Sequence, residues 1–231
     1  MNIAIIPARG GSKRIPDKNI KSFAGKPIIA YSIEAAKASG VFDKIIVSTD
    51  SERIADVAQK YGAEIPFMRP EEISDDHTPT APVLLHALNK LSKKNIIPDY
   101  ICCIYATAPF CTHEYIKEGF ELISGKKVSS VFSVTTFPFT IFRALKINQT
   151  GNLQMFYPEH ELTRSNDLPE AYHDAGQFYW LECKTFLKQK ELYTEDALPV
   201  ILPRYRVQDI DTTEDWETAE HMYNALQMSK R

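Results

Sequence analysis

The first residues that could do chemistry follow a short apolar run near the start of the chain. Pro7 ends this run, and the next stretch combines two glycines and a serine with several cations. Glycine can turn backbone N–H groups toward an anion, because it reaches conformations that other residues resist. Arginine and lysine supply the charge that a triphosphate needs. The residues are Gly10, Gly11 and Ser12, with Arg9, Lys13, Arg14 and Lys18 around them.

Two common phosphate-binding motifs are missing from this stretch. The sequence has no G-x-x-x-x-G-K-[ST], and Pro16 disfavours a long helix directly after the glycines. It has no G-x-G-x-x-G either, which removes the main support for a nicotinamide or flavin site. A basic surface turn is the alternative interpretation. The position after a buried strand favours phosphate binding.

Two carboxylates near the end of the chain form the best metal candidate. Asp209 and Asp211 are separated by Ile210. In an extended strand, residues two apart point the same way, so both carboxylates would share one face. Paired carboxylates and phosphate oxygens suit Mg²⁺. The alternative is that Asp211 caps the following helix while Asp209 is solvated.

Composition narrows the class of protein. The chain has 231 residues, 44% of them hydrophobic, and a formal net charge of −3. This length and hydrophobic content suit a single α/β domain over residues 1–231. The negative charge argues against general binding to nucleic acid or to an anionic membrane. Residues 1–26 nevertheless hold six Lys or Arg residues against the single Asp17, which favours a small anionic ligand.

No targeting signal or membrane-spanning run is visible in the sequence. The four cysteines, Cys102, Cys103, Cys111 and Cys183, lack the spacing of metal ligands. Buried reduced cysteines are typical of the cytoplasm, which is the expected location.

Strand and helix signals alternate from the start of the chain, which predicts a mainly parallel sheet flanked by helices. Ligands bind such sheets at the carboxyl ends of the strands. Strands are expected at 2–8, 44–50, 63–68, 99–106 and 128–136. Helices are expected from Pro27 to Gly40, from a capping box of Thr49 and Glu52 to Gly62, and at 80–93 and 112–124.

Residues 136–170 break this alternation. The strings RALKI and LQMF, joined by a turn at Asn148–Gly151, predict a β-hairpin flanked by prolines and aromatic residues. A lone hairpin is marginally stable in water, so a second subunit is expected to cover it in a homodimer. Strands are expected again at 176–182 and 200–211, followed by a helix containing Trp216.

The string IPARGGSKRIPDKNI resembles the N-terminal motif of the cytidylyltransferases that activate nine-carbon acid sugars, the CMP-sialic acid synthetase group. Four further strings match this family in order: RP at 69–70, ATAPF at 106–110, DLPEAY at 167–172 and QDIDTTEDW at 208–216. The resemblance implies a Rossmann-like fold of the nucleotide-diphospho-sugar transferase type. It also implies that CTP and an acid sugar are converted into a CMP-sugar and pyrophosphate.

The resemblance assigns roles to particular positions. Lys18, Arg9 and Asp211 would be catalytic, and Lys18 would steady charge on the α-phosphate. Asp209 and Asp211 would hold Mg²⁺. Tyr105 stands where many members carry glutamine. The residues that would bind CTP are Ala8, Arg9, Gly10, Ser12, Lys18, Asn19, Arg69, Thr80 and Thr107.

The string YHDAGQFYW looks most like the branch of the family that activates pseudaminic acid. Arg164 would pair with the sugar carboxylate, and His173, Asp174 and Gln177 would bond its polar substituents. The alternative is a surface turn that leads into a buried strand. Other acceptors remain open: N-acetylneuraminic or legionaminic acid, and the eight-carbon acid Kdo, which this string disfavours. A nucleotide-sensing module without catalysis is the alternative outside enzymes.

Overall fold

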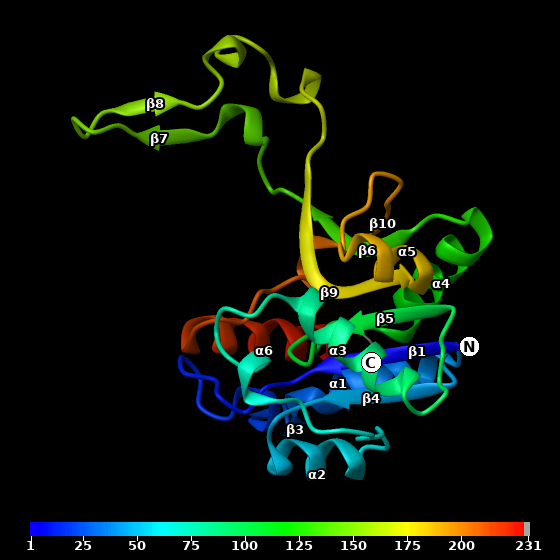
Figure 1. Cartoon of the computed structure of the whole chain (residues 1–231). Coiled ribbons are helices and arrows are strands. Elements are labelled where there is room, and N and C mark those ends of the chain that lie inside the picture. Colours follow the sequence, from blue (N-terminus) through cyan, green and yellow to red (C-terminus); the bar gives the residue numbers. More distant parts are fainter. Residues whose placement is uncertain (229–231) are drawn as a thin grey trace.

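A computed structural model describes residues 1–228 (Figure 1). Its centre is a six-stranded sheet with the strand order β10-β6-β9-β5-β1-β4. The strands are β1 (Asn2–Pro7), β4 (Lys44–Ser48), β5 (Tyr100–Ile104), β6 (Ser130–Thr136), β9 (Tyr172–Glu182) and β10 (Leu198–Ile201). Two small antiparallel pairs lie outside it: β2 (Ser22–Phe23) with β3 (Lys26–Pro27), and β7 (Leu145–Ile147) with β8 (Leu153–Met155).

The sheet is mainly parallel, as predicted. β1 runs parallel to β4 and to β5, and β10 runs parallel to β6. Residues 3–6 of β1 are fully buried because helices cover both faces of the sheet. β9 is the exception, since it runs antiparallel to both β5 and β6. The α/β prediction is therefore confirmed, with one reversed strand inserted near the middle of the sheet.

Helices form a layer on each face of the sheet. α1 (Ile28–Ser39), α2 (Glu52–Lys60) and α4 (His113–Lys126) pack into one hydrophobic core. α3 (Thr80–Ser92) and α5 (Cys183–Gln189) pack into a second core on the other face. α6 (Thr213–Met228) closes a third, smaller core with Phe23 and Tyr31. The remaining helices are short 3-10 turns: η1 (Lys18–Ile20), η2 (Glu71–Ile73), η3 (Ile141–Arg143), η4 (Pro158–His160), η5 (Ser165–Asp167) and η6 (Arg204–Arg206).

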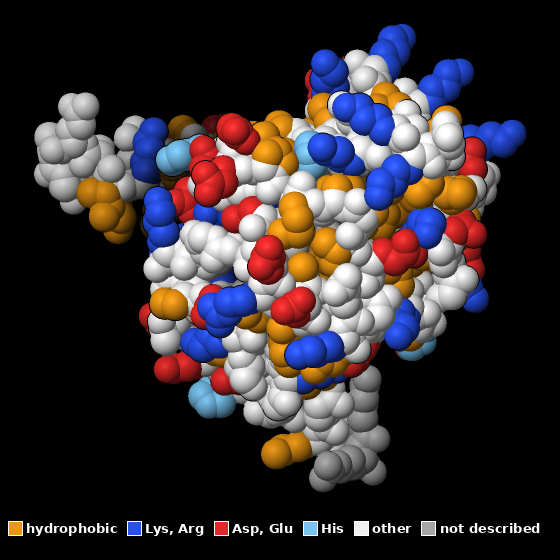
Figure 2. All heavy atoms as spheres, turned by 60° about the horizontal axis from the view of Figure 1, so that its bottom comes forward, with side chains coloured by type: hydrophobic (Ala, Val, Ile, Leu, Met, Phe, Trp, Pro, Cys, Tyr) orange, Lys and Arg blue, Asp and Glu red, His pale blue; other side chains and the backbone are white. Residues whose placement is uncertain are grey.

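The segment 137–171, called here the extension, projects away from the sheet and carries the predicted hairpin β7–β8 (Figure 1). Its apolar side chains are strongly exposed: Phe139 is 85%, Ile147 74%, Leu153 71% and Leu162 95% accessible. On the face of the molecule drawn in Figure 2, cationic and anionic side chains are intermingled. The extension thus gathers several strongly exposed apolar side chains in one projecting segment.

Two predicted strands are wrong in extent. Residues 63–68 form only an isolated bridge between Glu64 and Ile46. The run 200–211 pairs only as far as β10, after which η6 interrupts it, so Asp209 and Asp211 do not lie on a strand. Each run contains a proline, Pro66 or Pro203, which lacks the N–H that a sheet ladder requires. No helix within residues 1–228 has the length and apolar character to cross a membrane.

Candidate active site

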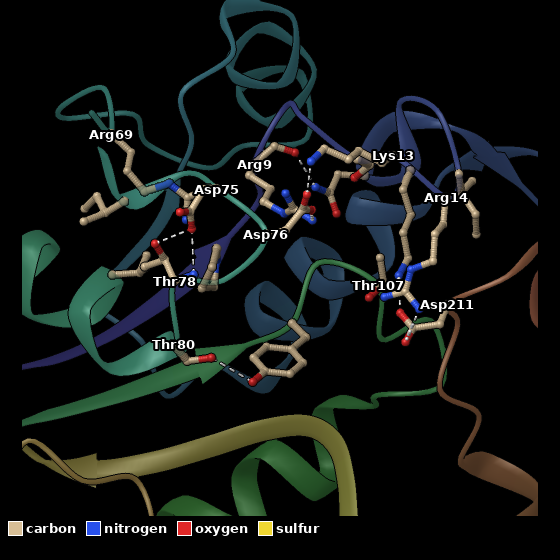
Figure 3. A pocket seen from close by; sticks show the side chains of 18 residues that line it. Arg9, Lys13, Arg14, Arg69, Asp75, Asp76, Thr78, Thr80, Thr107 and Asp211 are labelled. Carbon is tan, nitrogen blue, oxygen red and sulfur yellow. Dashed lines mark hydrogen bonds and ion pairs between the residues drawn. The ribbon is translucent and has the colours of Figure 1, made fainter. Parts of the chain in front are cut away.

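A cavity of about 250 Å³ opens beyond the carboxyl ends of β1 and β5, beside the first turn of α3 (Figure 3). This is where ligands bind in open α/β sheets. Four separate segments supply its walls: the loop after β1, the segment 69–80, the loop after β5, and Asp211 before α6. Of the residues predicted from sequence, it brings together Arg9, Ser12, Lys18, Asn19, Arg69, Thr80, Thr107 and Asp211.

The two glycines of the loop differ in their surroundings. The Gly10 N–H donates to Asp50 Oδ1 at 2.8 Å, so it faces the end of β4. A Cβ added at Gly10 would lie 3.0 Å from Ser51 Cβ, so a side chain there would crowd Ser51. A Cβ at Gly11 would meet nothing within 4 Å. Ala8 is fully buried, with its N–H bonded to Ser48 O at 2.9 Å. Ala8 and Gly10 therefore support the loop from behind.

Asp76 bridges two of the loop's cations from across the cavity. Its carboxylate pairs with the Arg9 guanidinium, and its other oxygen lies 2.5 Å from Lys13 Nζ (Figure 3). These two contacts lower the pKa of Asp76 to about 2. Asn19 holds the same part of the loop, because its side-chain amide donates to Arg9 O at 2.9 Å. The prediction from sequence missed Asp76, although the acidic string EEISDD marks its segment.

Asp211 bridges the other two cations. Its carboxylate oxygens lie 3.0 Å from Arg14 Nη1 and 3.5 Å from Lys18 Nζ. The Lys18 side chain is only 18% exposed, and that of Arg14 is 67% exposed. Lys18 is thus the cation held inside the cavity on this side.

Arg69 is a buried cation whose hydrogen bonds are incomplete. Its Nε donates to Ser74 Oγ at 3.0 Å, but Nη2 has no hydrogen-bond partner within residues 1–228. The nearest carboxylate oxygen, Asp50 Oδ1, is 3.8 Å away and helps to balance the charge. Burial lowers the pKa of Arg69, while Asp50 raises it. An incompletely bonded guanidinium lining a cavity is suited to donate to a polar ligand.

Tyr105, directly after β5, and Thr80, at the start of α3, form a polar part of the cavity wall. Their hydroxyl groups lie 2.9 Å apart (Figure 3). Burial raises the pKa of Tyr105, so its hydroxyl stays protonated at neutral pH. The sheet fixes the residue, because its N–H donates to Gln177 O at 2.9 Å. Together, the two hydroxyls can donate to and accept from a ligand.

Asp209 and Asp211 are close enough to influence each other electrostatically. Asp209 is exposed as a residue, but partial burial of its carboxyl group raises its pKa, and the charge of Asp211 raises it further. Ile210 between them is buried in the third core, so the expected alternation survives without a strand. Within the described part of the chain, no three His, Cys, Asp or Glu residues form a metal cluster. Two carboxylates fit Mg²⁺ that keeps phosphate and water ligands.

The cap of α6 is Thr212 and not Asp211. Thr212 Oγ1 accepts from the Asp215 N–H at 3.2 Å, and Asp215 Oδ2 accepts from the Thr212 N–H at 2.7 Å. This is a reciprocal capping arrangement. The capping alternative for Asp211 is therefore wrong, and its carboxylate faces Arg14 and Lys18 instead.

The four residues predicted to bind sugar lie elsewhere in the structure. Within residues 1–228, none of them lines the cavity. Arg164 lies in the extension, is 77% exposed, and pairs with Asp167 at 3.3 Å. His173 packs against Phe137 of the extension, with ring centroids 4.8 Å apart. Both residues are thus associated with the extension.

Asp174 and Gln177 make internal hydrogen bonds at a register shift between β6 and β9. The Asp174 carboxylate accepts from the hydroxyls of Tyr179 at 2.5 Å and Tyr193 at 2.6 Å. Gln177 is 3% exposed and donates to Arg206 O at 2.5 Å, while its Oε1 has no partner among the described residues. In this arrangement both side chains hold the strand in shape.

Comparison with known proteins bears on this geometry. A sequence model of the family described as cytidylyltransferase matches residues 3–226. The chain is 44% identical to pseudaminic acid cytidylyltransferase of Campylobacter jejuni subsp. jejuni serotype O:2, over 96% of each chain. It is 34% identical to CMP-N,N'-diacetyllegionaminic acid synthase of Legionella pneumophila, over 95% of each chain.

Two solved structures share the fold at low sequence identity. One is CMP:2-keto-3-deoxy-manno-octonic acid synthetase in complex with CTP, with a TM-score of 0.71, 15% identity, and coverage of 100% of this chain and 99% of that one. The other is 4-diphosphocytidyl-2C-methyl-D-erythritol synthase of Anaerococcus prevotii, with a TM-score of 0.63, 16% identity, and coverage of 96% and 98%. The expected fold type is confirmed. By the extent of the family match and of its relatives, the chain belongs to the cytidylyltransferase family and is a nucleotidyltransferase.

Proposed function

We propose that the protein transfers CMP from CTP to the anomeric hydroxyl of a nine-carbon acid sugar, pseudaminic acid, and releases pyrophosphate. One observation carries the nucleotide part: four cations of a single loop surround the cavity beyond β1, beside Asp211. The acceptor follows from the relative that is 44% identical over 96% of each chain, which is a pseudaminic acid cytidylyltransferase.

The nucleotide lies along the cavity with its phosphates against the cationic loop. Arg9 and Lys18 neutralise the phosphate oxygens, with Lys18 at the α-phosphate, and Ser12 and Asn19 line the same end. Gly11 leaves room for close approach of the phosphates. Arg69, Thr80 and Thr107 contact the nucleoside at the other end, where the Nη2 group of Arg69 donates a hydrogen bond.

The reaction requires alignment and charge neutralisation more than covalent help from the protein. The sugar hydroxyl loses its proton to solvent as its oxygen attacks the α-phosphorus, the bond to the bridging oxygen breaks, and pyrophosphate leaves with that oxygen. Lys18 holds charge that develops on the α-phosphate, from a side chain that is largely withdrawn from solvent. The rigid ends of the strands keep both substrates aligned.

We propose Mg²⁺ as the cofactor, held by Asp209 and Asp211. When bound, the ion polarises the phosphate and offsets charge in the transition state. Asp211 lines the cavity, so it can exchange its contacts with Arg14 and Lys18 for the ion. Asp209 adds a second carboxylate, and its raised pKa fits a group that gains from a nearby cation.

We propose that the acceptor site is completed by a second copy of the chain in a homodimer. The extension carries exposed apolar side chains that need a covering surface. Arg164, in the extension, pairs with the sugar carboxylate, and His173 bonds a polar substituent of the sugar. Asp174 and Gln177 shape the strand from which these contacts are made, and they face the sugar once it binds.

We also propose that residues 1–231 act as a single catalytic domain with the segment 136–170 as its dimerisation and sugar-site extension. We propose a cytoplasmic location, because all four cysteines are free and buried, as is usual for proteins in a reducing compartment.

The test is an assay of pyrophosphate release with a panel of nucleoside triphosphates and acid sugars. We expect release that requires CTP, pseudaminic acid and Mg²⁺ together. Turnover with another nine-carbon acid or with Kdo, but not with pseudaminic acid, would refute the acceptor. CTP binding without turnover on any acid sugar would favour a nucleotide sensor.

A further inference from the structure

The segment between Arg69 and α3 places a carboxylate where a phosphate group is expected. Asp76 contacts Arg9 and Lys13, which belong to the loop at the end of β1. Its side chain is 27% exposed and lies within the cavity wall. A carboxylate that bridges two cations offers them the same kind of oxygen ligands as a terminal phosphate. Asp76 and a bound phosphate therefore require the same two side chains.

The turn that presents Asp76 is held by its neighbour. Asp75 Oδ1 accepts from the His77 N–H at 3.0 Å and from the Thr78 N–H at 2.7 Å. The Thr78 hydroxyl donates to the same oxygen at 2.6 Å. Asp75 is thus bonded within its own segment, whereas Asp76 is bonded across the cavity. Adjacent carboxylates have separate tasks, one fixing the turn and the other pairing with the loop.

We propose that Asp76 is an internal counter-ion that competes with the pyrophosphate end of the nucleotide for Arg9 and Lys13, and so promotes release of the pyrophosphate product. The identity of the competing anion rests on the proposed function. No bond is made or broken. The two cations exchange one anionic partner for another, and Asp76 pairs with them again when pyrophosphate leaves.

The physical consequence concerns the product more than the substrate. In the proposed function CTP also contacts Arg69 and Thr80, which line the same cavity, whereas free pyrophosphate lacks these nucleoside contacts. A competitor confined to Arg9 and Lys13 therefore takes a larger share of the binding free energy of pyrophosphate than of CTP. Asp76 is ionised throughout the neutral range because its pKa is about 2. The competition is then present at every working pH.

The experiment compares the full chain with Asp76→Asn, using pyrophosphate alone as the probe in titration calorimetry. Asn keeps the shape of the side chain but removes the charge that holds Arg9 and Lys13. We expect pyrophosphate to bind about tenfold more tightly to Asp76→Asn at low ionic strength. The gain should shrink as salt is added, because screening weakens both the competitor and the ligand.

Asp75→Asn is the matched control. It removes the same charge one residue away, and the Asn side-chain oxygen can still accept the bonds that fix the turn. We expect its affinity for pyrophosphate to stay within about twofold of the parent. In steady-state assays, Asp76→Asn should show stronger product inhibition by pyrophosphate, with a larger fractional change in that constant than in the KM for CTP.

Equal or weaker pyrophosphate binding by Asp76→Asn would overturn the proposal, since Asp76 would then have no effect on pyrophosphate binding or would favour it. An equal gain in Asp75→Asn would overturn it too, because general charge and not pairing would be responsible. The binding arm needs neither CTP nor sugar. A failure of the proposed function would appear separately, as lack of turnover by the parent chain.

Discussion

The cavity proposed for the nucleotide and the extension proposed for the acceptor differ in how far one chain completes them. On the nucleotide side, cations and hydroxyls from four segments line a single cavity, and most already have partners. On the acceptor side, Arg164 is 77% exposed in the extension, and Leu162 beside it is 95% exposed. One chain is therefore enough to assemble the cavity proposed for the nucleotide, but it leaves the apolar side chains of the extension uncovered.

This contrast separates two kinds of physical requirement. Triphosphate binding needs charge at fixed positions, which rigid strand ends supply. The extension instead exposes apolar area that a partner surface would remove from water. If this contrast holds, substitutions in the cationic loop should lower turnover without changing dimer formation. Substitutions in the hairpin should weaken the dimer without changing CTP binding.

The largest expected effect is that of Lys18→Ala. Loss of the ammonium removes the charge proposed to act at the α-phosphate, and kcat should fall on the order of 10²-fold or more. Thermal stability and the oligomeric state should stay as in the parent, because Lys18 contributes little to the core. Lys21→Ala is the control, since Lys21 Nζ lies over the Trp216 ring at 4.6 Å and does not line the cavity. Near-normal turnover of a folded Lys18→Ala protein would contradict the assignment.

The hairpin is tested by the double variant Ile147→Asp, Leu153→Asp. Two charges placed in an apolar interface should raise the dimer Kd by about 30-fold or more, as measured by light scattering over a range of concentrations. Binding of CTP should be unchanged in calorimetry. Ile97→Asp is the control, because Ile97 is 73% exposed on the compact body. A parent chain that is monomeric at working concentration would refute the dimer.

Asp211 and Thr212 separate metal binding from helix capping. Asp211→Asn should lower turnover about tenfold or more at low Mg²⁺, with partial recovery as Mg²⁺ rises, because the anionic oxygen is lost. Its melting temperature without ligand should barely change. Thr212→Ala should cost about 1 kcal/mol of stability as a lost cap, with an unaltered dependence on Mg²⁺. An Asp211→Asn enzyme that is fully active at low Mg²⁺ would exclude the metal role.

The smallest expected effect concerns the two glycines. Gly11→Ala should keep the parent's melting temperature, because the new methyl group meets no protein atom within 4 Å, and should weaken binding of CTP at the proposed site about fivefold. Gly10→Ala should instead destabilise the fold by about 1–3 kcal/mol, because its Cβ would crowd Ser51. The measurements are calorimetric titration and thermal unfolding. Unchanged CTP affinity in Gly11→Ala would show that the phosphates do not approach this residue.

Much of the fold could be predicted because local signals were strong. The helix ending at Gly40 has the expected left-handed cap, with φ of 67°, and the hairpin lies where alternation and turn residues placed it. The direction of β9 could not be predicted. Its sequence is a buried apolar strand in either direction, and only the return path of the extension makes it antiparallel. Pro66 and Pro203 were the sequence signals against strands over the whole of 63–68 and 200–211.

The site was predictable where its residues are neighbours in sequence. The cations of the loop could be recognised from their spacing, but their partners could not. Asp50 meets Gly10 across 40 positions in the sequence, and Asp76 reaches Arg9 because the segment between α2 and α3 forms part of the cavity wall. Such contacts depend on tertiary packing. For the same reason, the sequence could not predict that the Asp174 carboxylate accepts hydrogen bonds from the hydroxyls of Tyr179 and Tyr193.

The antiparallel pairing of β6 and β9 has a consequence for how such a molecule can vary. Thr136 and Tyr172 face each other in the last pair of that ladder, and the Phe137 N–H donates to Ala171 O at 3.3 Å. The whole extension therefore leaves and rejoins the sheet at one rung. The entropy lost on closing a loop grows slowly with loop length. A shorter or longer insert could therefore connect Thr136 to Tyr172 with little change in the free energy of folding. The extension can therefore change in length or sequence between related chains while the cationic loop after β1 and the central sheet keep their structure.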